Sequence, residues 1–257
     1  MKPYWEHKLI SLCACLAIVL AWWLFSRFAG LSEIILPSPE AVGRRLERVL
    51  SSGYKGHGLF AHLGYSLRRL FTAYGLAVVT AIPIGLLSGC LPRLRTALDP
   101  LISFYRPLPP LAYYTVLVLW MGIDDGSKVA LLYLAGFWPL YISSVAGVAR
   151  MRSDYTNGAK TLGAGPVQIF LYVIFPVALP DIFVGLRTSL GFMYSTLVAA
   201  EMVAAVSGIG WMVLDASKYL QSDVIFLGII VMGLTGILLD SALNLAEKKA
   251  VFWKGRE

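Results

Sequence analysis

Six long runs of apolar residues follow one another along the chain, separated by shorter polar stretches. A bilayer has a hydrocarbon core about 30 Å thick, which roughly 20 apolar residues cross as a helix. The pattern therefore predicts six membrane-spanning helices, at about residues 9–28, 64–90, 101–121, 127–149, 180–206 and 223–246. We expect an all-α membrane protein in which residues 1–257 form one transmembrane domain with both termini on the same side.

The first apolar run follows the basic residues Lys2 and Lys8 and ends in Trp22 and Trp23. A secretory signal peptide also begins with basic residues, but its apolar part is shorter and a small-x-small cleavage site follows it. This run is long enough to span a membrane and has no clear site of that kind after it. We therefore expect a first helix that is retained.

A polar segment between the first two spans, LPSPEAVGRRLERVL at 36–50, carries the signals of a short helix. Ser38 is a typical N-cap, Pro39 suits the first helical position and Glu40 falls in the first turn. Apolar residues then recur at helical spacing from Val42 onward. Such an amphipathic helix either lies on the outer membrane interface or packs on the spans, and the sequence favours neither alternative.

The longest polar segment, residues 150–179, separates the fourth and fifth spans and is expected on the cytoplasmic side. Ser153 is a suitable helix start, because its hydroxyl can accept an otherwise unpaired backbone N–H. The helix is expected to run to Leu162, and Gly163 is the expected left-handed stop. The first half of the segment is therefore predicted to be a helix closed by a glycine turn.

A second short helix is predicted in the other half of the same segment. Pro166 suits its first position, where the missing N–H removes no hydrogen bond. Pro176 and Pro180 are expected to end this helix and to start the fifth span, because proline interrupts a helix interior. The segment thus predicts an elbow of helix, glycine turn, helix and proline turn, which is more structure than a plain connector needs.

Composition supports the membrane assignment. Hydrophobic residues make up 58% of the chain and charged residues only 14%, whereas about a quarter of a soluble domain is charged. The net charge of +7 does not indicate a nucleic-acid partner, because no basic run is interleaved with exposed aromatic residues. Lysine and arginine residues that flank membrane spans explain the excess.

The distribution of these charges favours termini in the cytoplasm. That orientation places thirteen of the 22 lysine and arginine residues inside: Lys2, Lys8, Arg93, Arg95, Arg106, Arg150, Arg152, Lys160, Arg187, Lys248, Lys249, Lys254 and Arg256. Two outer loops then carry only Lys128 and Lys218. The first outer segment breaks the pattern with Arg27, Arg44, Arg45, Arg48, Lys55, Arg68 and Arg69.

No catalytic or metal-binding group is predicted. The candidate side chains are scattered or lie in apolar runs: Cys13, Cys15, Cys90, His7, His57 and His62. Asp124 and Asp125 precede Gly126 and indicate a turn that caps the fourth span. The sequence also lacks G-x-x-x-x-G-K-[ST], the glycine loop that binds nucleotide phosphates, so we expect no cofactor bound by this chain.

The elbow resembles a known motif. Its sequence NGAKTLGAGPVQIFLYVIFP (157–176) is similar to the "EAA" loop of ABC importer permeases, in which E-A-A, three residues, glycine, nine residues and I-x-L-P follow one another. The glycine and proline positions match, but Asn157 stands where the family has glutamate. Further segments, such as STLVAAEMVAAVSGIGWMV (195–213), are most similar to the nitrate, sulfonate and taurine branch, and to taurine permeases within it.

This resemblance implies a type I permease fold and a role for the elbow. In such importers the elbow is a coupling helix that seats in a separate ATPase, and two ATPases pull two elbows together. The residues it implies for this contact are Asn157, Gly158, Ala159, Lys160, Gly163, Ala164, Pro166, Val167, Ile169, Phe170 and Pro176. It also implies a second permease chain, expected to be an identical copy, and an extracytoplasmic substrate-binding protein.

A few residues inside the spans are candidates for the substrate pathway or its gate. Glu201 is the main one, and we expect it to accept hydrogen bonds that brace the pore wall more than to touch an anion. Arg187 lies near the inner end of the same span, about 21 Å away, so the two cannot pair. The broken start of the third span supplies the other candidates: Tyr105, Arg106, Pro107, Pro109, Tyr113 and Tyr114.

The sequence and the resemblance together predict the permease subunit of an ATP-driven importer of a sulfonate-like anion, with taurine as the expected substrate. Alkanesulfonate, nitrate and other small solutes are the alternatives. A secondary transporter or channel that works without ATP is less favoured, because intramembrane charges are few and no inverted repeat is evident. An intramembrane enzyme is the least favoured, because no catalytic group is assembled.

Overall fold

A computed structural model describes residues 4–28, 30 and 32–253, apart from the side chains of residues 4–8. These residues form helices and no strand. The elements are α1 Tyr4–Phe28, α2 Pro39–Ser52, α3 Leu59–Cys90, α4 Pro92–Tyr105, α5 Pro110–Met121, α6 Asp125–Ala149, α7 Ser153–Thr161, α8 Pro166–Ile169, the π-helical turn η1 Phe170–Ile174, α9 Phe175–Ala204, α10 Ile209–Lys218 and α11 Ser222–Ala250. The expected all-α class is confirmed.

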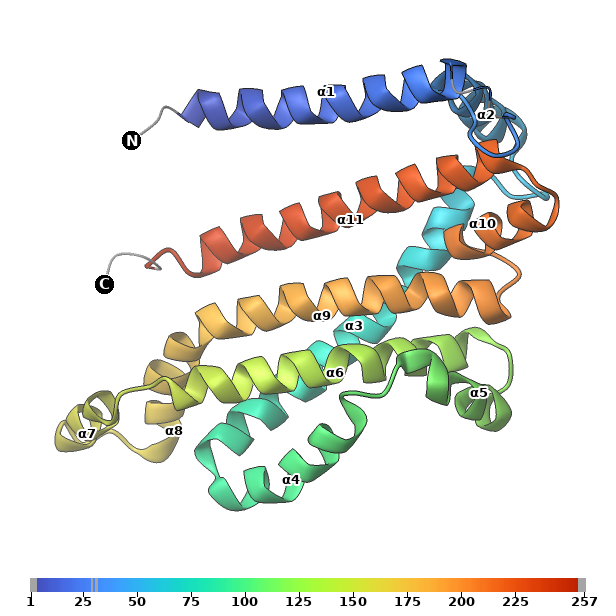
Figure 1. The fold of residues 1–257 in the computed structure, drawn as a ribbon. Helices are drawn as coiled ribbons and strands as arrows, with labels where there is room; N and C mark the ends of the chain where they lie inside the picture. Colours follow the sequence, from blue (N-terminus) through green and yellow to red (C-terminus); the bar gives the residue numbers. More distant parts are fainter. Residues whose placement is uncertain (1–3, 29, 31, 254–257) are drawn as a thin grey trace.

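The core lies where α6 packs against α3 on one side and α9 on the other (Figure 1). Small residues allow these helices to approach closely. Such close packing is common in membrane proteins, because the hydrophobic effect does not drive helices together inside lipid. A Cβ added at Gly85 of α3 would lie 2.8 Å from the Tyr141 carbonyl oxygen of α6. A Cβ at Gly136 of α6 would lie 2.3 Å from the Met193 sulfur of α9. The three helices thus form a closely packed unit, and α4, α5 and α10 pack against it.

Among the described residues, five helices are long and apolar enough to cross a membrane: α1 over Leu9–Phe28, α3, α6, α11, and the continuous helical stretch Pro166–Ala204. The third predicted span, 101–121, is divided into α4 and the shorter apolar helix α5, with residues 106–109 between them. Three prolines in RPLPP prevent a continuous helix there, because each removes a donor and restricts the residue before it. The broken start expected for this span is therefore present.

The fifth span differs from its prediction. Pro176 and Pro180 do not separate it from the preceding helix, and α8, η1 and α9 form one helical stretch from Pro166 to Ala204. The π-helical turn Phe170–Ile174 lies directly before Pro176. A wider turn relieves the clash between a proline ring and the carbonyl one turn earlier, so the helix continues. The elbow is therefore joined to the membrane span by helix and not by a loop.

The short helix α2 confirms its predicted start, since the Ser38 hydroxyl accepts the Ala41 N–H at 3.2 Å. Its apolar face packs on α10 and α11, with Val42 and Val49 buried in a shared cluster. Arg45 pairs with Asp223 of α11 at 2.7 Å. These contacts favour packing on the spans over the interfacial alternative. The helix α10 was not predicted from the sequence.

The two ends of the molecule carry different features. Figure 1 shows α7 and α8 at one end, together with the start of α1 and the end of α11. The opposite end holds α2, α5 and α10. Lys2, Lys254 and Arg256, which the charge argument used, lie outside the described residues. The elbow and the described ends of the first and last helices thus share one side of the membrane domain.

Candidate functional site

The elbow is built from local backbone signals. Its first helix, α7, has Arg152 as N-cap, so Ser153 is the first helical residue and not the cap that the sequence suggested. Gly163 has φ +83, the left-handed conformation expected of the helix stop. Pro166 begins α8, and the Gln168 side chain accepts the Gly165 N–H at 2.8 Å. The turn between the helices is therefore fixed by its own residues.

The outer face of the elbow exposes apolar side chains. Leu162 is 89% exposed, Val167 70% and Tyr172 76%. Asn157 and Lys160 are exposed beside them. A shallow hollow of about 390 Å³ is lined by Ala159, Leu162, Gly163, Ala164, Gln168, Tyr172 and Val173. Apolar groups concentrated on a water-facing element mark a protein contact surface.

Two of the residues expected at this contact have another role. Ile169 is buried, and Phe170 packs on Leu86, Val148 and Ile182 of the membrane helices. The expectation that Ile169 and Phe170 face a partner is therefore corrected for this conformation, whereas Val167 does face outward. The reason is that alternate faces of α8 and η1 point toward the domain and away from it, as helical spacing requires.

The elbow is also tied to the membrane domain by charge. Arg150, after the end of α6, pairs with Asp181 of α9 at 2.7 Å across the base of the elbow. Pro176 lines a cleft at the same place, half-buried. A segment held by helix continuity, packing and an ion pair transmits displacement as a rigid body, which a loop would not.

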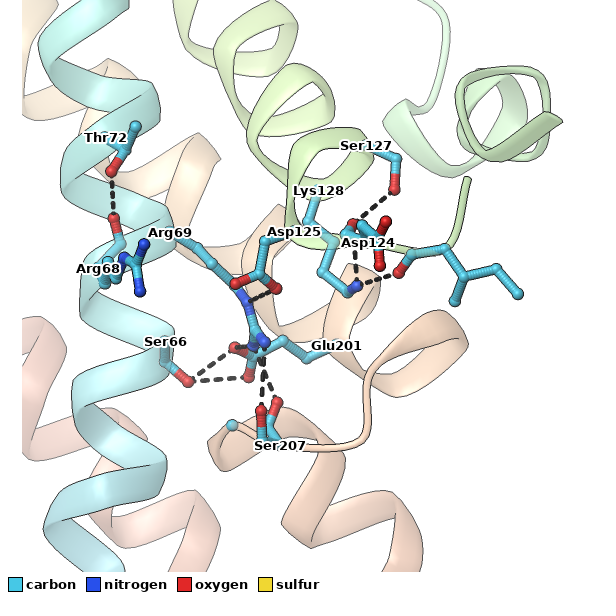
Figure 2. Close-up of polar contacts among 12 residues, drawn as sticks. Ser66, Arg68, Arg69, Thr72, Asp124, Asp125, Ser127, Lys128, Glu201 and Ser207 are labelled. Carbon is cyan, nitrogen blue, oxygen red and sulfur yellow. Dashed lines mark hydrogen bonds and ion pairs between the residues drawn. The ribbon is translucent and has the colours of Figure 1, made fainter. Parts of the chain in front are cut away.

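A second polar site lies at the opposite end, around the buried carboxylate of Glu201 in α9. Arg69 of α3 donates to Glu201 Oε1 at 2.7 Å and to Asp125 Oδ1 at 2.8 Å, and it also donates to the Ser207 carbonyl at 2.8 Å (Figure 2). Ser66 donates to both Glu201 oxygens, at 2.8 and 2.9 Å. Glu201 is 1% exposed, so this carboxylate is almost completely enclosed.

Ser207, Gly208 and the first turn of α10 wrap around the same carboxylate. Gly210 N–H donates to Glu201 Oε2 at 2.9 Å, and Ile209 N–H donates to the Ser66 hydroxyl at 3.0 Å. Gly208 N–H donates to His62 Nδ1 at 3.2 Å. Three consecutive backbone donors are thus paired with side chains of α3 and α9, which joins these helices to the start of α10.

The network continues into the loop between α2 and α3. His62 Nε2 lies 3.2 Å from the Tyr54 carbonyl oxygen, and the Tyr54 hydroxyl donates to Asp215 of α10 at 2.9 Å. Burial, together with the neighbouring Asp215 carboxylate, raises the pKa of the Tyr54 hydroxyl well above its ordinary value. Tyr54 therefore stays a neutral donor, and α2, α3 and α10 remain connected across the physiological pH range.

Comparison with known proteins identifies the family. A model of the binding-protein-dependent transport system inner membrane component matches residues 81–251, more than half of the chain, including the elbow and Glu201. The chain belongs to this family. The permease is 38% identical over 254 residues, 98% of its own length and 92% of the other, to the taurine transport system permease protein TauC of Escherichia coli (strain K12).

Other relatives support the same branch. The permease is 36% identical over 239 residues to a second Escherichia coli (strain K12) protein, SsuC, whose name refers to aliphatic sulfonates transport; the match covers 92% of the permease and 88% of SsuC. It is 30% identical over 258 residues to the bicarbonate transport system permease protein CmpB of Synechocystis sp., with 96% and 92% covered. The expected nitrate, sulfonate and taurine branch of ABC permeases is thereby confirmed.

The pathway candidates from the broken third span do not form one site. Tyr114 is buried against Leu131 and Ala200 in the permease core, so it cannot line an open pathway in this conformation. Tyr105 donates to the Leu134 carbonyl at 3.0 Å. Arg106 lies over the Trp138 ring, 5.6 Å from its centroid.

The remaining candidates from this region have mixed surroundings. Tyr113 packs beside Tyr114, whereas Pro107 is exposed and Pro109 stands in the interruption between α4 and α5. A role of these residues in the pathway stays a prediction. Most of the aromatic side chains of this region are used to pack α5 and the end of α4 onto α6.

Sequence reasoning missed Arg69. The charge count assigned it to an outer segment, but it lies inside α3 and its side chain is 5% exposed. Two features of the sequence could have predicted a buried role for Arg69. It lies five residues into the predicted span at 64–90, one turn after Ser66, and another span contains the acidic residue Glu201. The bracing contacts expected of Glu201 are those that Arg69, Ser66 and Gly210 supply.

A substitution at Gly208 tests how closely the protein encloses the Glu201 carboxylate. Gly208 has φ +121, and a Cβ there would lie 2.4 Å from the Glu201 carboxylate. We expect Gly208→Ala to lower the free energy of unfolding by about 1–3 kcal/mol, because it adds both backbone strain and a clash. Thermal unfolding in detergent measures this. Gly64→Ala in α3 is the control, since nothing lies within 4 Å of the added Cβ, and an equal loss there would contradict the argument.

Proposed function

We propose that the permease is the membrane subunit of an ATP-driven importer that carries a small sulfonate-like anion, taurine, into the cytoplasm. The elbow supports this most directly, because it combines a fixed turn, exposed Leu162 and Val167, and a rigid connection to α9. The likeness to the taurine transport system permease protein over 98% of the chain supports the choice of substrate.

The proposed orientation places the elbow and both termini in the cytoplasm of a bacterium, with the permease in its inner membrane. Basic residues near the elbow end support it, because positive charge is retained inside. They include Arg93, Arg95, Arg150, Arg152, Lys160, Lys248 and Lys249. The buried position of Arg69 removes one of the apparent violations at the opposite end, since that charge is paired inside the protein.

The proposed assembly contains two copies of the permease, two ATPase subunits that hold ATP and Mg, and an extracytoplasmic binding protein. The permease itself has no phosphate-binding glycine loop in its sequence, so the energy would reach it through the elbow. When the ATPases close, each elbow would move with the start of α9, and the two halves of the pore would tilt from inward-facing to outward-facing.

Alkanesulfonate, nitrate and other small solutes remain the alternative substrates, and the names of SsuC and CmpB illustrate that range among relatives. A transporter without an ATPase is the alternative of another class. It has less support, because an exposed apolar elbow face has no use in a protein that works alone.

Reconstitution tests the proposed function. We expect proteoliposomes that contain the permease, its ATPase and its binding protein to accumulate taurine only when ATP is supplied on the elbow side. Radiolabelled uptake measures this, and the matched control is the same assembly with a non-hydrolysable ATP analogue. Uptake by the permease alone, driven by an ion gradient, would instead identify a secondary transporter.

A further inference from the structure

Arg106 is an arginine at membrane depth without an acidic partner. It stands in the break between α4 and α5, and its guanidinium carbon lies 5.6 Å from the centroid of the Trp138 ring in α6. Counted along α6, Trp138 is about 20 Å from the start of the helix and about 17 Å from its end. The cation therefore lies midway through the membrane domain, and not on the inner side where the charge count placed it.

A charge at this depth needs a polar partner or water. Among the residues that the structure describes, no carboxylate forms an ion pair with Arg106, and Arg106 is exposed in the single chain. A cation–π contact at an exposed site is weak beside the cost of an arginine at the centre of a bilayer. In membrane proteins such groups face the interior of the helix bundle or a water-filled cavity. The exposed side of Arg106 therefore does not face acyl chains.

A hollow of about 370 Å³ begins at Arg106 and follows the seam between α4 and α6. It ends at Ala149, the last residue of α6 before the elbow. Along α4 it extends about 16 Å, from Arg106 back to Arg95, and Figure 1 shows the start of α4 on the side that carries α7 and α8. The hollow thus connects the middle of the membrane domain with the elbow end, and its volume falls within the range of small-ligand sites.

The charges in the hollow favour an anion. Two guanidinium groups, of Arg95 and Arg106, and one carboxylate, of Asp99, line it. Both oxygens of the carboxylate are already engaged, since Arg95 Nε donates to Asp99 Oδ2 at 3.1 Å and the Tyr141 hydroxyl donates to Asp99 Oδ1 at 3.2 Å. Within the described part of the chain, no hydrogen bond uses the side-chain N–H groups of Arg106. These donors remain available to a solute, and a guanidinium fork suits an oxoanion.

We propose that Arg106 is the residue that binds the anionic group of the solute midway along the pathway, and that the hollow between α4 and α6 carries a small sulfonate from there toward the elbow side. Trp138 is a positioning residue, because its ring holds the guanidinium without occupying an N–H donor. Ser103 in the same hollow offers a hydroxyl one turn before Arg106. The inference rests on the proposed function, which identifies the anion as the transported solute.

Thiol labelling of the reconstituted transporter tests the site without ATP. Cys13, Cys15 and Cys90 are replaced by serine, and Ser103→Cys then places a thiol in the hollow. Two methanethiosulfonate reagents are compared, one with a sulfonatoethyl group and one with a trimethylammonioethyl group, each rate being divided by that with a free thiol in solution. We expect the corrected rates to favour the sulfonate reagent about tenfold, and Arg106→Gln to abolish this preference, because an adjacent cation attracts the anionic reagent.

Uptake provides the second measurement. Arg106→Gln should lower ATP-driven taurine uptake about tenfold or more while ATP hydrolysis by the assembly continues, because a charge-assisted contact with the solute is lost. Arg106→Lys keeps the cation and should retain more uptake than Arg106→Gln. Arg93→Gln is the matched control, because Arg93 is an exposed arginine of α4 that does not line the hollow. We expect it to leave both uptake and the labelling preference unchanged.

The outcomes are distinguishable. Failure of both reagents to reach the introduced thiol overturns the inference, because the hollow would then be covered by lipid or by a second copy of the permease. A labelling preference that survives Arg106→Gln also overturns it, as does normal uptake in that variant. Absence of ATP-driven uptake by the unaltered transporter, with the labelling preference present, refutes the proposed function and supports the anion site alone.

Discussion

Replacement of Arg69 by methionine is expected to destabilise the permease by about 3–5 kcal/mol, because it leaves the buried Glu201 carboxylate without its cation. Glu201 is 1% exposed and cannot recover water at that position. Arg69 also holds Asp125 at the start of α6 and the Ser207 carbonyl before α10. Thermal unfolding in detergent, followed by tryptophan fluorescence, measures the loss.

Two further variants separate this effect from a general loss of charge. Arg68→Met removes the adjacent arginine, which is exposed, and we expect a change within about 0.5 kcal/mol. Glu201→Gln in the Arg69→Met background removes the unpaired charge but keeps groups that can bond Ser66 and Gly210. It should restore part of the lost stability. A double variant less stable than Arg69→Met would show that the ion pair is not the reason.

Replacement of Gly163 by valine is expected to lower ATP-driven uptake by about tenfold or more while the permease stays folded. Gly163 has φ +83, which a β-branched residue adopts only with a strain of order 1–3 kcal/mol. No atom lies within 4 Å of an added Cβ, so the cost falls on the backbone of the turn and not on packing. The altered bend would misplace Leu162 and Val167 against the ATPase.

The controls use the same segment. Gly163→Asn should retain most uptake, because asparagine tolerates the left-handed conformation better than other residues. Gly158→Ala, within α7 and with nothing near its Cβ, should be close to unaltered. Copurification of the ATPase and vesicle uptake are measured together. Full uptake in Gly163→Val would contradict the role assigned to the turn.

The elbow and the Glu201 site divide the permease into two mechanical regions. Around Glu201 the side chains of Ser66, Arg69 and Glu201 from α3 and α9 are buried and hydrogen-bonded to one another and to the start of α10. At the elbow, apolar side chains stand exposed on a rigid support. This arrangement suits a domain that moves as a body when force is applied at one end, because buried networks resist internal rearrangement.

Features that depend on neighbours along the chain were determined by the sequence itself. Five of the six apolar runs specify membrane helices, since their length matches the hydrocarbon core, whereas prolines divide the third run into α4 and α5. Ser38 and Pro39 start α2, Gly163 ends the first helix of the elbow and Pro166 begins the second, because capping and left-handed turns are properties of a few adjacent residues.

Features that depend on which helix faces meet were decided only by the tertiary structure. Arg69 and Glu201 are separated by 132 residues and Arg187 and Asp240 by 53, and no local pattern states that they pair. The burial of Ile169 and the continuation of the helix through Pro176 follow from packing and from one widened turn. The sequence of a membrane protein therefore shows how many charged residues it contains. Which of these residues pair with one another depends on how the helices pack.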